Sequence, residues 1–204
     1  PQVTAIRPAA RGIINKVNTS QGDVAHRANL TRIDLGTDGT GTKICVLSDS
    51  IDHLEGVQAS GDLPVDIDIL PEQDGLGLGS TGEGTAMLEI VHDLAPGADL
   101  YFATAFNGQA SFADNILALR DAGCHVIVDD VSYFAEPVFQ DGIIAQAVET
   151  VTADGALYFS SAGNSGNYND GTAGVWEGDF VGITAPSGIP YSGPAADFGG
   201  GTNF

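Results

Sequence analysis

Apolar strand-like segments alternate with helix-like segments between residues 43 and 161, and this alternation constrains the fold more than any other feature of the sequence. The sequence predicts strands at 43–47, 99–105, 125–130 and 156–161, with helices at 85–94, 111–122 and 143–154 between them. Strands and helices that alternate at this spacing indicate a parallel sheet with right-handed crossover connections. We therefore expect an α/β fold with three layers and a mainly parallel central sheet.

Two segments do not follow this alternation. Residues 1–35 are predicted to be an N-terminal lead-in, with a short helix at 25–33 for which Asp23 is the N-cap. Residues 52–80 are rich in Gly and Asp and are predicted to be irregular, apart from a short strand at 65–70.

Four aspartates of the irregular segment are candidate ligands for a structural calcium ion, because calcium prefers hard oxygen ligands. They are Asp62, Asp66, Asp68 and Asp74. Their spacing matches no EF-hand loop, so solvated loop charge is the alternative. We identify no other cofactor.

The charge balance of the chain excludes several classes of partner. Its formal net charge is −20, from 27 acidic residues against 7 Lys and Arg. Such a chain is expected to repel nucleic acids and anionic membranes, since phosphate binding needs clustered basic residues. No apolar run approaches the ~20 residues that span a bilayer. We predict a secreted, extracellular protein.

Two cysteines, Cys45 and Cys124, lie in or beside predicted buried strands. Buried free thiols are the expected state, and a disulfide between them is the alternative. Neither cysteine has metal-ligand spacing or the surroundings of a nucleophile.

Polar side chains gather at one edge of the predicted sheet. Asp49, Asp130 and Asn164 lie at or just beyond the ends of predicted strands, and Glu83 lies at the start of a helix. In open α/β sheets, functional groups collect at the carboxyl ends of the strands. These four residues are therefore a candidate site.

Four short segments occur in an order that indicates a family. They are 46–52 (Val-Leu-Ser-Asp-Ser-Ile-Asp), 83–85 (Glu-Gly-Thr), 95–98 (Ala-Pro-Gly-Ala) and 162–164 (Ala-Gly-Asn). Over residues 36–166 this pattern resembles the subtilisin-like (subtilase) serine peptidases, and in particular the sedolisins, the serine-carboxyl peptidases. The resemblance implies a subtilisin-like fold and a serine endopeptidase that hydrolyses polypeptides.

The resemblance also implies roles for individual residues. Glu83 stands where subtilases have His, as in sedolisins, and would be the general base and then the general acid. Asn164 would donate to the oxyanion. The acid partner that sedolisins place four residues after the Glu is Met87 here, so Asp49 or Asp130 must take that role.

Two further assignments depend on the same resemblance. An ungapped alignment places Ser48 on the family aspartate, so the choice of Asp49 needs a one-residue offset. Asp130 and Ser132 are expected to line the substrate-binding groove.

The nucleophilic serine of the family is not in this sequence. None of the 204 residues forms a Gly-Thr-Ser segment, and Gly-Thr-Asn at 201–203 follows Asn164 too closely. We expect residues 36–204 to be the N-terminal portion of the peptidase domain, incomplete at its C-terminus and inactive alone. Its partners would be a polypeptide substrate and the C-terminal remainder of the same catalytic domain.

Two other functions compete with the peptidase. One is a catalytically inactive pseudopeptidase that serves as a binding or adhesion domain. The other is a nucleotide-binding α/β domain, but no Gly-x-Gly-x-x-Gly follows the first strand and no P-loop is present.

Overall fold

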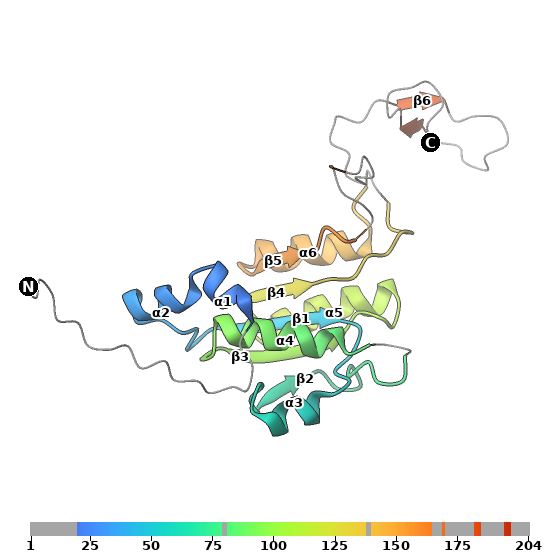
Figure 1. The fold of residues 1–204 in the computed structure, drawn as a ribbon. Helices are drawn as coiled ribbons and strands as arrows, with labels where there is room; N and C mark the ends of the chain where they lie inside the picture. Colours follow the sequence, from blue (N-terminus) through green and yellow to red (C-terminus); the bar gives the residue numbers. More distant parts are fainter. Residues whose placement is uncertain are drawn as a thin grey trace, which may run out of the picture. The chain divides into compact units, whose positions relative to one another are not determined.

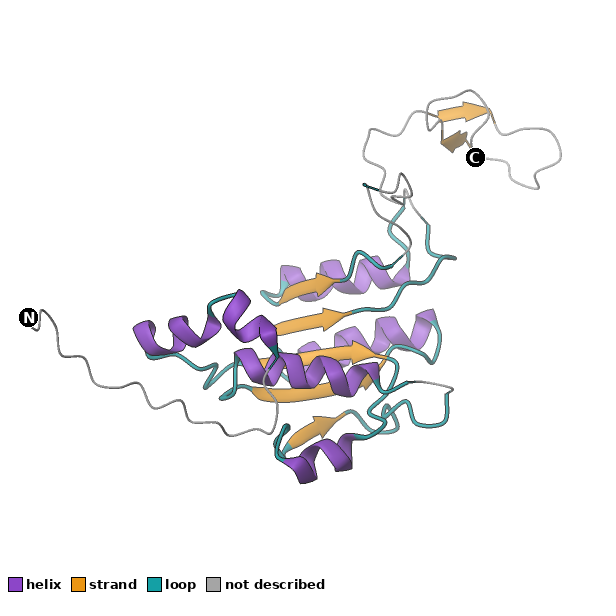
Figure 2. Cartoon of the chain, in the orientation of Figure 1, coloured by secondary structure: helices purple, strands orange, loops and turns teal. Residues whose placement is uncertain are grey.

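The computed structural model describes residues 20–78, 81–137, 140–164, 169, 182–184 and 194–196. By their contacts these residues fall into two units, which lie within 1–136 plus 141–162 and within 137–140 plus 163–204. In the second unit, β6 (Gly182–Thr184) and β7 (Pro194–Ala196) pair antiparallel. All the described helices belong to the first unit (Figures 1 and 2).

The described part of the first unit alternates helices and strands along the chain. Its helices are α1 (Gln21–Ala25), α2 (Ala28–Leu35), α3 (Leu54–Ser60), α4 (Glu83–Leu94), α5 (Gln109–Asp121) and α6 (Ile143–Ala153). Its strands are β1 (Lys43–Ser48), β2 (Ile67–Ile69), β3 (Asp99–Thr104), β4 (Val126–Asp129) and β5 (Leu157–Ser160).

The five strands form one parallel sheet in the order β2-β3-β1-β4-β5. This sheet confirms the predicted three-layer α/β fold. The central strand β1 pairs with β3 and β4, so that Ser48 lies opposite Thr104 and Leu47 lies opposite Asp129. The carboxyl ends of the three neighbouring strands β3, β1 and β4 therefore lie at the same edge of the sheet.

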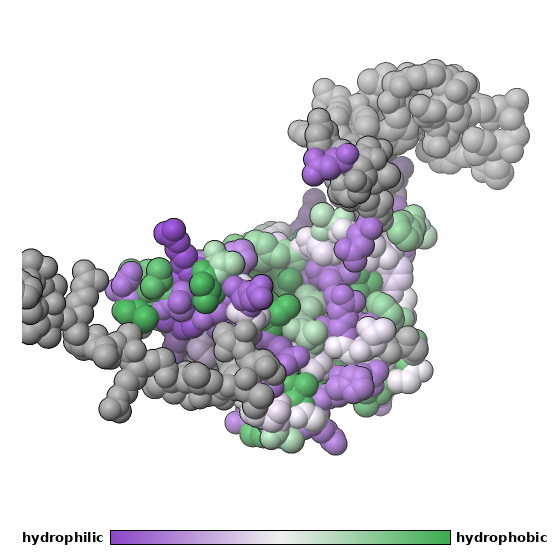
Figure 3. Space-filling view, in the orientation of Figure 1, coloured by the Kyte–Doolittle hydropathy of each residue, from purple (hydrophilic) through white to green (hydrophobic). Residues whose placement is uncertain are grey.

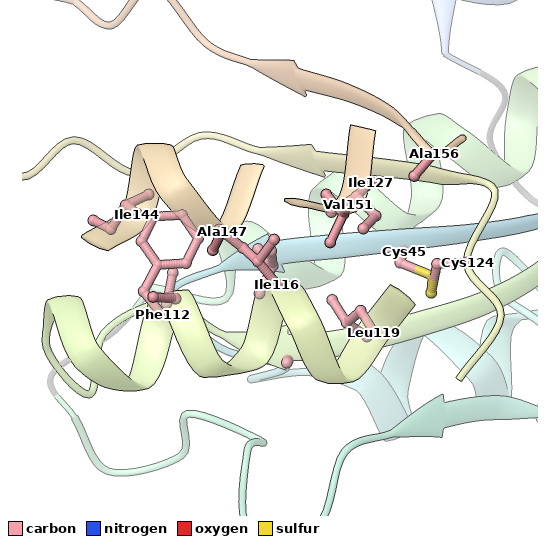
Figure 4. Close-up of a cluster of buried hydrophobic side chains, with 14 residues drawn as sticks. Cys45, Phe112, Ile116, Leu119, Cys124, Ile127, Ile144, Ala147, Val151 and Ala156 are labelled. Atoms are coloured by element: carbon pink, nitrogen blue, oxygen red, sulfur yellow. A yellow bond between two sulfur atoms is a disulfide. The ribbon is translucent and has the colours of Figure 1, made fainter. Parts of the chain in front are cut away.

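The two faces of the sheet carry separate hydrophobic cores because successive side chains of a strand point to opposite faces. Cys45 and Leu47 of β1 pack beneath α5 and α6, in the cluster that Figure 4 shows. Val46 packs on the other face with Leu54 of α3 and Leu88 of α4. Burial of both faces explains the nearly continuous apolar sequence of β1.

One crossover connection differs in hand from the other three. The β2–α4–β3 and β3–α5–β4 connections move in the same direction along the sheet, but α4 and α5 cover opposite faces (Figure 1). Crossover connections between parallel strands are right-handed in nearly all proteins, and the sequence pattern predicts that all four connections here are right-handed. The β2–α4–β3 connection is left-handed, which places α4 against β3 and the central strand β1.

The lead-in forms two helices instead of the single helix predicted at 25–33. The chain breaks at Arg27, whose φ of 59° lies in the left-handed region. Asp23 is no N-cap: its buried carboxylate pairs with Arg32 at 2.8 Å. Arg32 also donates to the carbonyl oxygens of Asp93 and Leu94 at 3.2 and 2.8 Å, which joins α2 to the C-terminal end of α4.

The outer surface of α1 and α2 carries exposed apolar side chains, some of which are visible in Figure 3. They are Val24, Leu30, Ile33 and Leu35. Both helices belong to the first unit, and the boundary predicted after residue 35 stays a prediction.

The cysteines correct a second expectation. Cys45 and Cys124 are fully buried, as predicted, but they form a disulfide instead of remaining free thiols (Figure 4). Their Cα atoms lie 6.0 Å apart, which is an ordinary separation for a disulfide. The sequence spacing could not show this, because it is the pairing of β1 with β4 that brings the two residues together.

Candidate functional site

The candidate site lies where the central strands end. The connection that leaves β1 leads toward β2, and the one that leaves β4 leads toward β5, on the opposite side of β1. Open α/β sheets bind ligands at the carboxyl ends of strands whose connections diverge in this way. Ser48 ends β1 and is followed by Asp49, and Asp129 ends β4 and is followed by Asp130.

Asp49 holds the chain that leads into α4. One carboxylate oxygen, Oδ2, accepts hydrogen bonds from Thr81 N at 2.6 Å, Thr81 Oγ1 at 3.1 Å and Gly82 N at 3.1 Å. The other oxygen, Oδ1, accepts from Ser50 N at 2.5 Å and Gly84 N at 3.1 Å. The carboxylate thus binds backbone N–H groups at the start of the helix, which helix geometry leaves without partners.

These hydrogen bonds keep Asp49 ionised. Burial alone would raise its pKa, but the donors from Thr81, Gly84 and Ser50 outweigh burial and lower the pKa below the ordinary value. The positive end of the α4 dipole acts in the same direction. Asp49 is therefore a buried carboxylate whose two oxygens are both used by the loop that presents Glu83.

The glycines on either side of Glu83 are required by close backbone contacts. Gly82 has a φ of +79°, and a Cβ there would lie 2.7 Å from the carbonyl oxygen of Asp52. A Cβ at Gly84 would meet the ring of Phe102 and would lie 2.5 Å from the carbonyl oxygen of Ser50. The Gly-Glu-Gly sequence lets α4 begin directly above the end of β1.

Glu83 itself is exposed at the first position of α4. Within the described residues, no hydrogen bond joins it to Asp49 or to Asp130. Its charge nevertheless acts on Asp130, as the pKa of that aspartate shows. Glu83 is thus accessible from solvent and electrostatically coupled to a second carboxyl group.

Asp130 differs from Asp49 in its hydrogen bonding. Both of its carboxylate oxygens are buried, and neither has a hydrogen-bond partner within the described residues. Burial, together with the negative charges of Glu83, Asp129 and Asp49, raises the pKa of Asp130 to about 6. The hydroxyl of Ser48 lies close enough to lower this pKa, although the two groups lack the geometry of a hydrogen bond.

The neighbouring Asp129 has different surroundings on the opposite face of the sheet. It accepts hydrogen bonds from Tyr158 Oη at 2.6 Å and from Ser160 Oγ at 2.8 Å, which join β4 to β5. Burial raises the pKa of Asp129, and these hydrogen bonds offset the rise only in part. Burial also raises the pKa of Tyr158, so its hydroxyl stays protonated and donates.

The structure brings three of the five predicted site residues together. Asp49, Glu83 and Asp130 lie at the same edge of the first unit. Ser132 is exposed just beyond β4, and its place in a substrate groove stays a prediction. Asn164 belongs to the second unit, so its oxyanion role also stays a prediction.

Sequence reasoning did not recognise Ser48 as a neighbour of Asp130. The register of β1 with β4 would have identified it. Leu47 pairs with Asp129, so the next residues on β1 and β4 point to the same face of the sheet.

The predicted calcium ligands do not form a cluster. Within the residues that the structure describes, no group of three or more His, Cys, Asp or Glu side chains could hold a metal ion. In the same residues, no helix is long and apolar enough to cross a membrane.

None of the protein-family models matches the sequence, and a search of curated proteins finds no match either.

Proposed function

We propose that this chain supplies the general base of a serine endopeptidase of the subtilase and sedolisin type. The observation that carries the proposal is the position of Glu83. It is an exposed carboxylate at the first turn of α4, and Asp49 holds the surrounding backbone by accepting four hydrogen bonds from Thr81, Gly82 and Gly84. A general base needs this combination of access to substrate and a rigid backbone.

The proposed reaction uses a serine from a segment outside this sequence. As the serine oxygen attacks the peptide carbonyl carbon, Glu83 accepts the hydroxyl proton and the carbonyl oxygen becomes an oxyanion. The side-chain amide of Asn164 would donate to that oxyanion, an interaction worth about 3–4 kcal/mol. When the C–N bond breaks, Glu83 returns the proton to the leaving nitrogen. The acyl group stays on the serine oxygen as an acyl-enzyme, which water then hydrolyses.

The proposal predicts activity at acidic pH. A carboxylate is a weak base, so it needs a second carboxyl group that shares its proton and so adjusts its basicity. Above the pKa of that second group both carboxyls are ionised, and the shared proton is lost. We therefore expect hydrolysis to be fastest at acidic pH and to decline as the pH rises toward neutrality.

The test is the Glu83→Gln variant of the protein that contains this chain together with the nucleophile segment. Hydrolysis of a fluorogenic peptide pool is measured between pH 3 and pH 8. Removal of a general base is expected to lower kcat/KM by about 10²- to 10⁴-fold. Glu55→Gln is the matched control, because Glu55 is also an exposed helical glutamate but lies on α3. Unchanged hydrolysis by Glu83→Gln would refute the proposal.

A binding or adhesion domain is the second candidate, and one observation favours it. Asp49 is fully occupied by backbone donors and a threonine hydroxyl, which is a structural role that a domain without catalysis would also need. Assays of the protein that contains this chain together with the nucleophile segment distinguish the two functions. A binding domain shows no hydrolysis at any pH and no reaction of a serine with a fluorophosphonate probe.

A further inference from the structure

We propose that Asp130, oriented by Ser48, is the group that shares a proton with Glu83, in the place that subtilases give to the aspartate after the first strand. This inference rests on the proposed function, since it names the positioning residue of the same site. It assigns Asp49 a different task, the support of the loop that carries Glu83.

The carboxyl group of Asp130 is buried and has no hydrogen-bond partner of its own within the described residues. A buried carboxylate with no donor is costly, so such a group in a native fold calls for an explanation. A carboxyl group that carries a proton and donates it to a neighbouring carboxylate removes this cost.

Ser48 provides an independent observation. Its side chain is completely buried, and Oγ has no hydrogen-bond partner within the described residues. It points to the same face of the sheet as Asp130, because β1 and β4 are parallel and in register. A small rotation of either side chain would let the hydroxyl donate to Asp130 and fix the carboxyl plane.

The charged groups around Asp130 come from three elements. Glu83 approaches from α4, Asp49 from the end of β1, and Asp129 precedes Asp130 on its own strand; each raises the pKa of Asp130. A proton held between Asp130 and Glu83 would relieve this repulsion. Of the three neighbours, Glu83 has the largest effect.

Asp49 is poorly suited to the same task. Hydrogen bonds occupy both of its oxygens and lower its pKa below the ordinary value, which favours the ionised form. A carboxylate that is already satisfied has no proton to share. Of the two aspartates that the sequence offers as partners of Glu83, Asp130 is therefore the better suited.

The first experiment is the pH–rate profile of Asp130→Asn in the protein that contains the nucleophile segment. The wild-type profile is expected to show an alkaline limb near pH 6, because Asp130 loses its proton there. Asparagine cannot share a proton, so the variant should lose about 10²- to 10⁴-fold in kcat/KM and also lose this limb. Asp130→Glu should restore the limb, which a merely structural role would not do.

Asp129→Asn is the matched control. It changes an adjacent aspartate of the same strand end, but Asp129 faces Tyr158 and Ser160 on the other side of the sheet. This variant should keep an alkaline limb. Ser48→Ala should keep the limb as well but shift it toward higher pH, because the Ser48 hydroxyl lowers the pKa of Asp130.

The second experiment needs no catalysis and uses the 204-residue chain itself. Carbon-13 NMR of aspartate-labelled protein should show one carboxyl group that titrates at about pH 6. Asp130→Asn should remove this signal, and Glu83→Gln should move it to lower pH, because a neighbouring negative charge is lost.

The outcomes separate this inference from the proposed function. If Glu83→Gln abolishes hydrolysis while Asp130→Asn keeps both rate and limb, the peptidase stands and the role of Asp130 is refuted. An ordinary aspartate titration for Asp130, unaffected by Glu83→Gln, also overturns the inference. If Glu83→Gln leaves hydrolysis unchanged, both proposals fail.

Discussion

Replacing Asp49 by asparagine should strongly destabilise the first unit, because the amide cannot satisfy the donors that the carboxylate holds. Oδ1 accepts from Ser50 N and Gly84 N, and Oδ2 accepts from Thr81 and Gly82. Asparagine has one carbonyl oxygen, and its NH₂ group would face the donors on the other side. In either orientation at least two donors lose their acceptor.

The expected loss follows from these contacts. A hydrogen bond to a charged group contributes about 1.5–3 kcal/mol, so two of them amount to about 3–6 kcal/mol. Asp49 is only 3% exposed, and water can replace these bonds only in part. The loss is large compared with the ~5–15 kcal/mol that usually separates a folded domain from its unfolded state.

Urea denaturation followed by far-UV circular dichroism measures this loss, since all the described helices belong to the first unit. Glu83→Gln is the control: it is also an acid-to-amide change, but at an exposed residue. We expect it to alter the free energy of unfolding by less than about 0.5 kcal/mol. A loss of less than about 1 kcal/mol for Asp49→Asn would refute the supporting role of Asp49.

The difference in free energy of unfolding between wild type and Asp49→Asn should depend on pH in a defined direction. The folded pKa of Asp49 is lowered, so its ionised form stabilises the fold fully above the unfolded value of about 3.9. This contribution is lost as the pH falls below that value and through the folded pKa. The stability difference between wild type and Asp49→Asn should therefore be constant near neutral pH and shrink only in acid.

Two further predictions concern the cores on the two faces of the sheet. Removing the disulfide with Cys45→Ala and Cys124→Ala should cost about 4–5 kcal/mol in urea denaturation, because it closes a loop across a separation of 79 residues. Alkylation of either thiol in native buffer containing reductant would contradict the complete burial of both cysteines. Leu88→Ala should cost about 2–5 kcal/mol in the same assay, since Leu88 is fully buried on the side of α4 that packs against the sheet. Ile90→Ala on the exposed side of that helix should cost less than about 1 kcal/mol, and equal losses for the two variants would count against the packing described for α4.

The order of elements from β1 to β5 could be predicted because it depends on local pattern. The apolar runs of the strands, the helical periodicity between them and the glycines after the helices are all read within a few residues. Strands expected at 43–47, 99–105, 125–130 and 156–161 are observed as β1, β3, β4 and β5. A local pattern also shows which residues end the strands, so Asp49 and Asp130 could be predicted at the sheet edge.

Other elements were missed because their sequences are locally ambiguous. Helix α3 lies in a segment whose many Gly and Asp residues predict irregular structure, but Leu54 is held in the core beside Val46 and Leu88. Tertiary packing outweighs a weak propensity in such a case. The break between α1 and α2 lies at Arg27, and the ion pair of Asp23 with Arg32 joins the two helices across it, a contact that no periodicity shows.

The sequence by itself determined the α/β class, the strand ends and the presence of a glutamate at the start of α4. The tertiary structure decided how the carboxyl groups at that edge are used. Asp49 and Asp130 look alike in sequence, since each follows an apolar strand. Asp49 differs because the loop before α4 folds back over it and supplies donors from more than 30 residues away. Within the described residues Asp130 receives no such donors, and burial raises its pKa, because burial and hydrogen bonding depend on which segments meet in space.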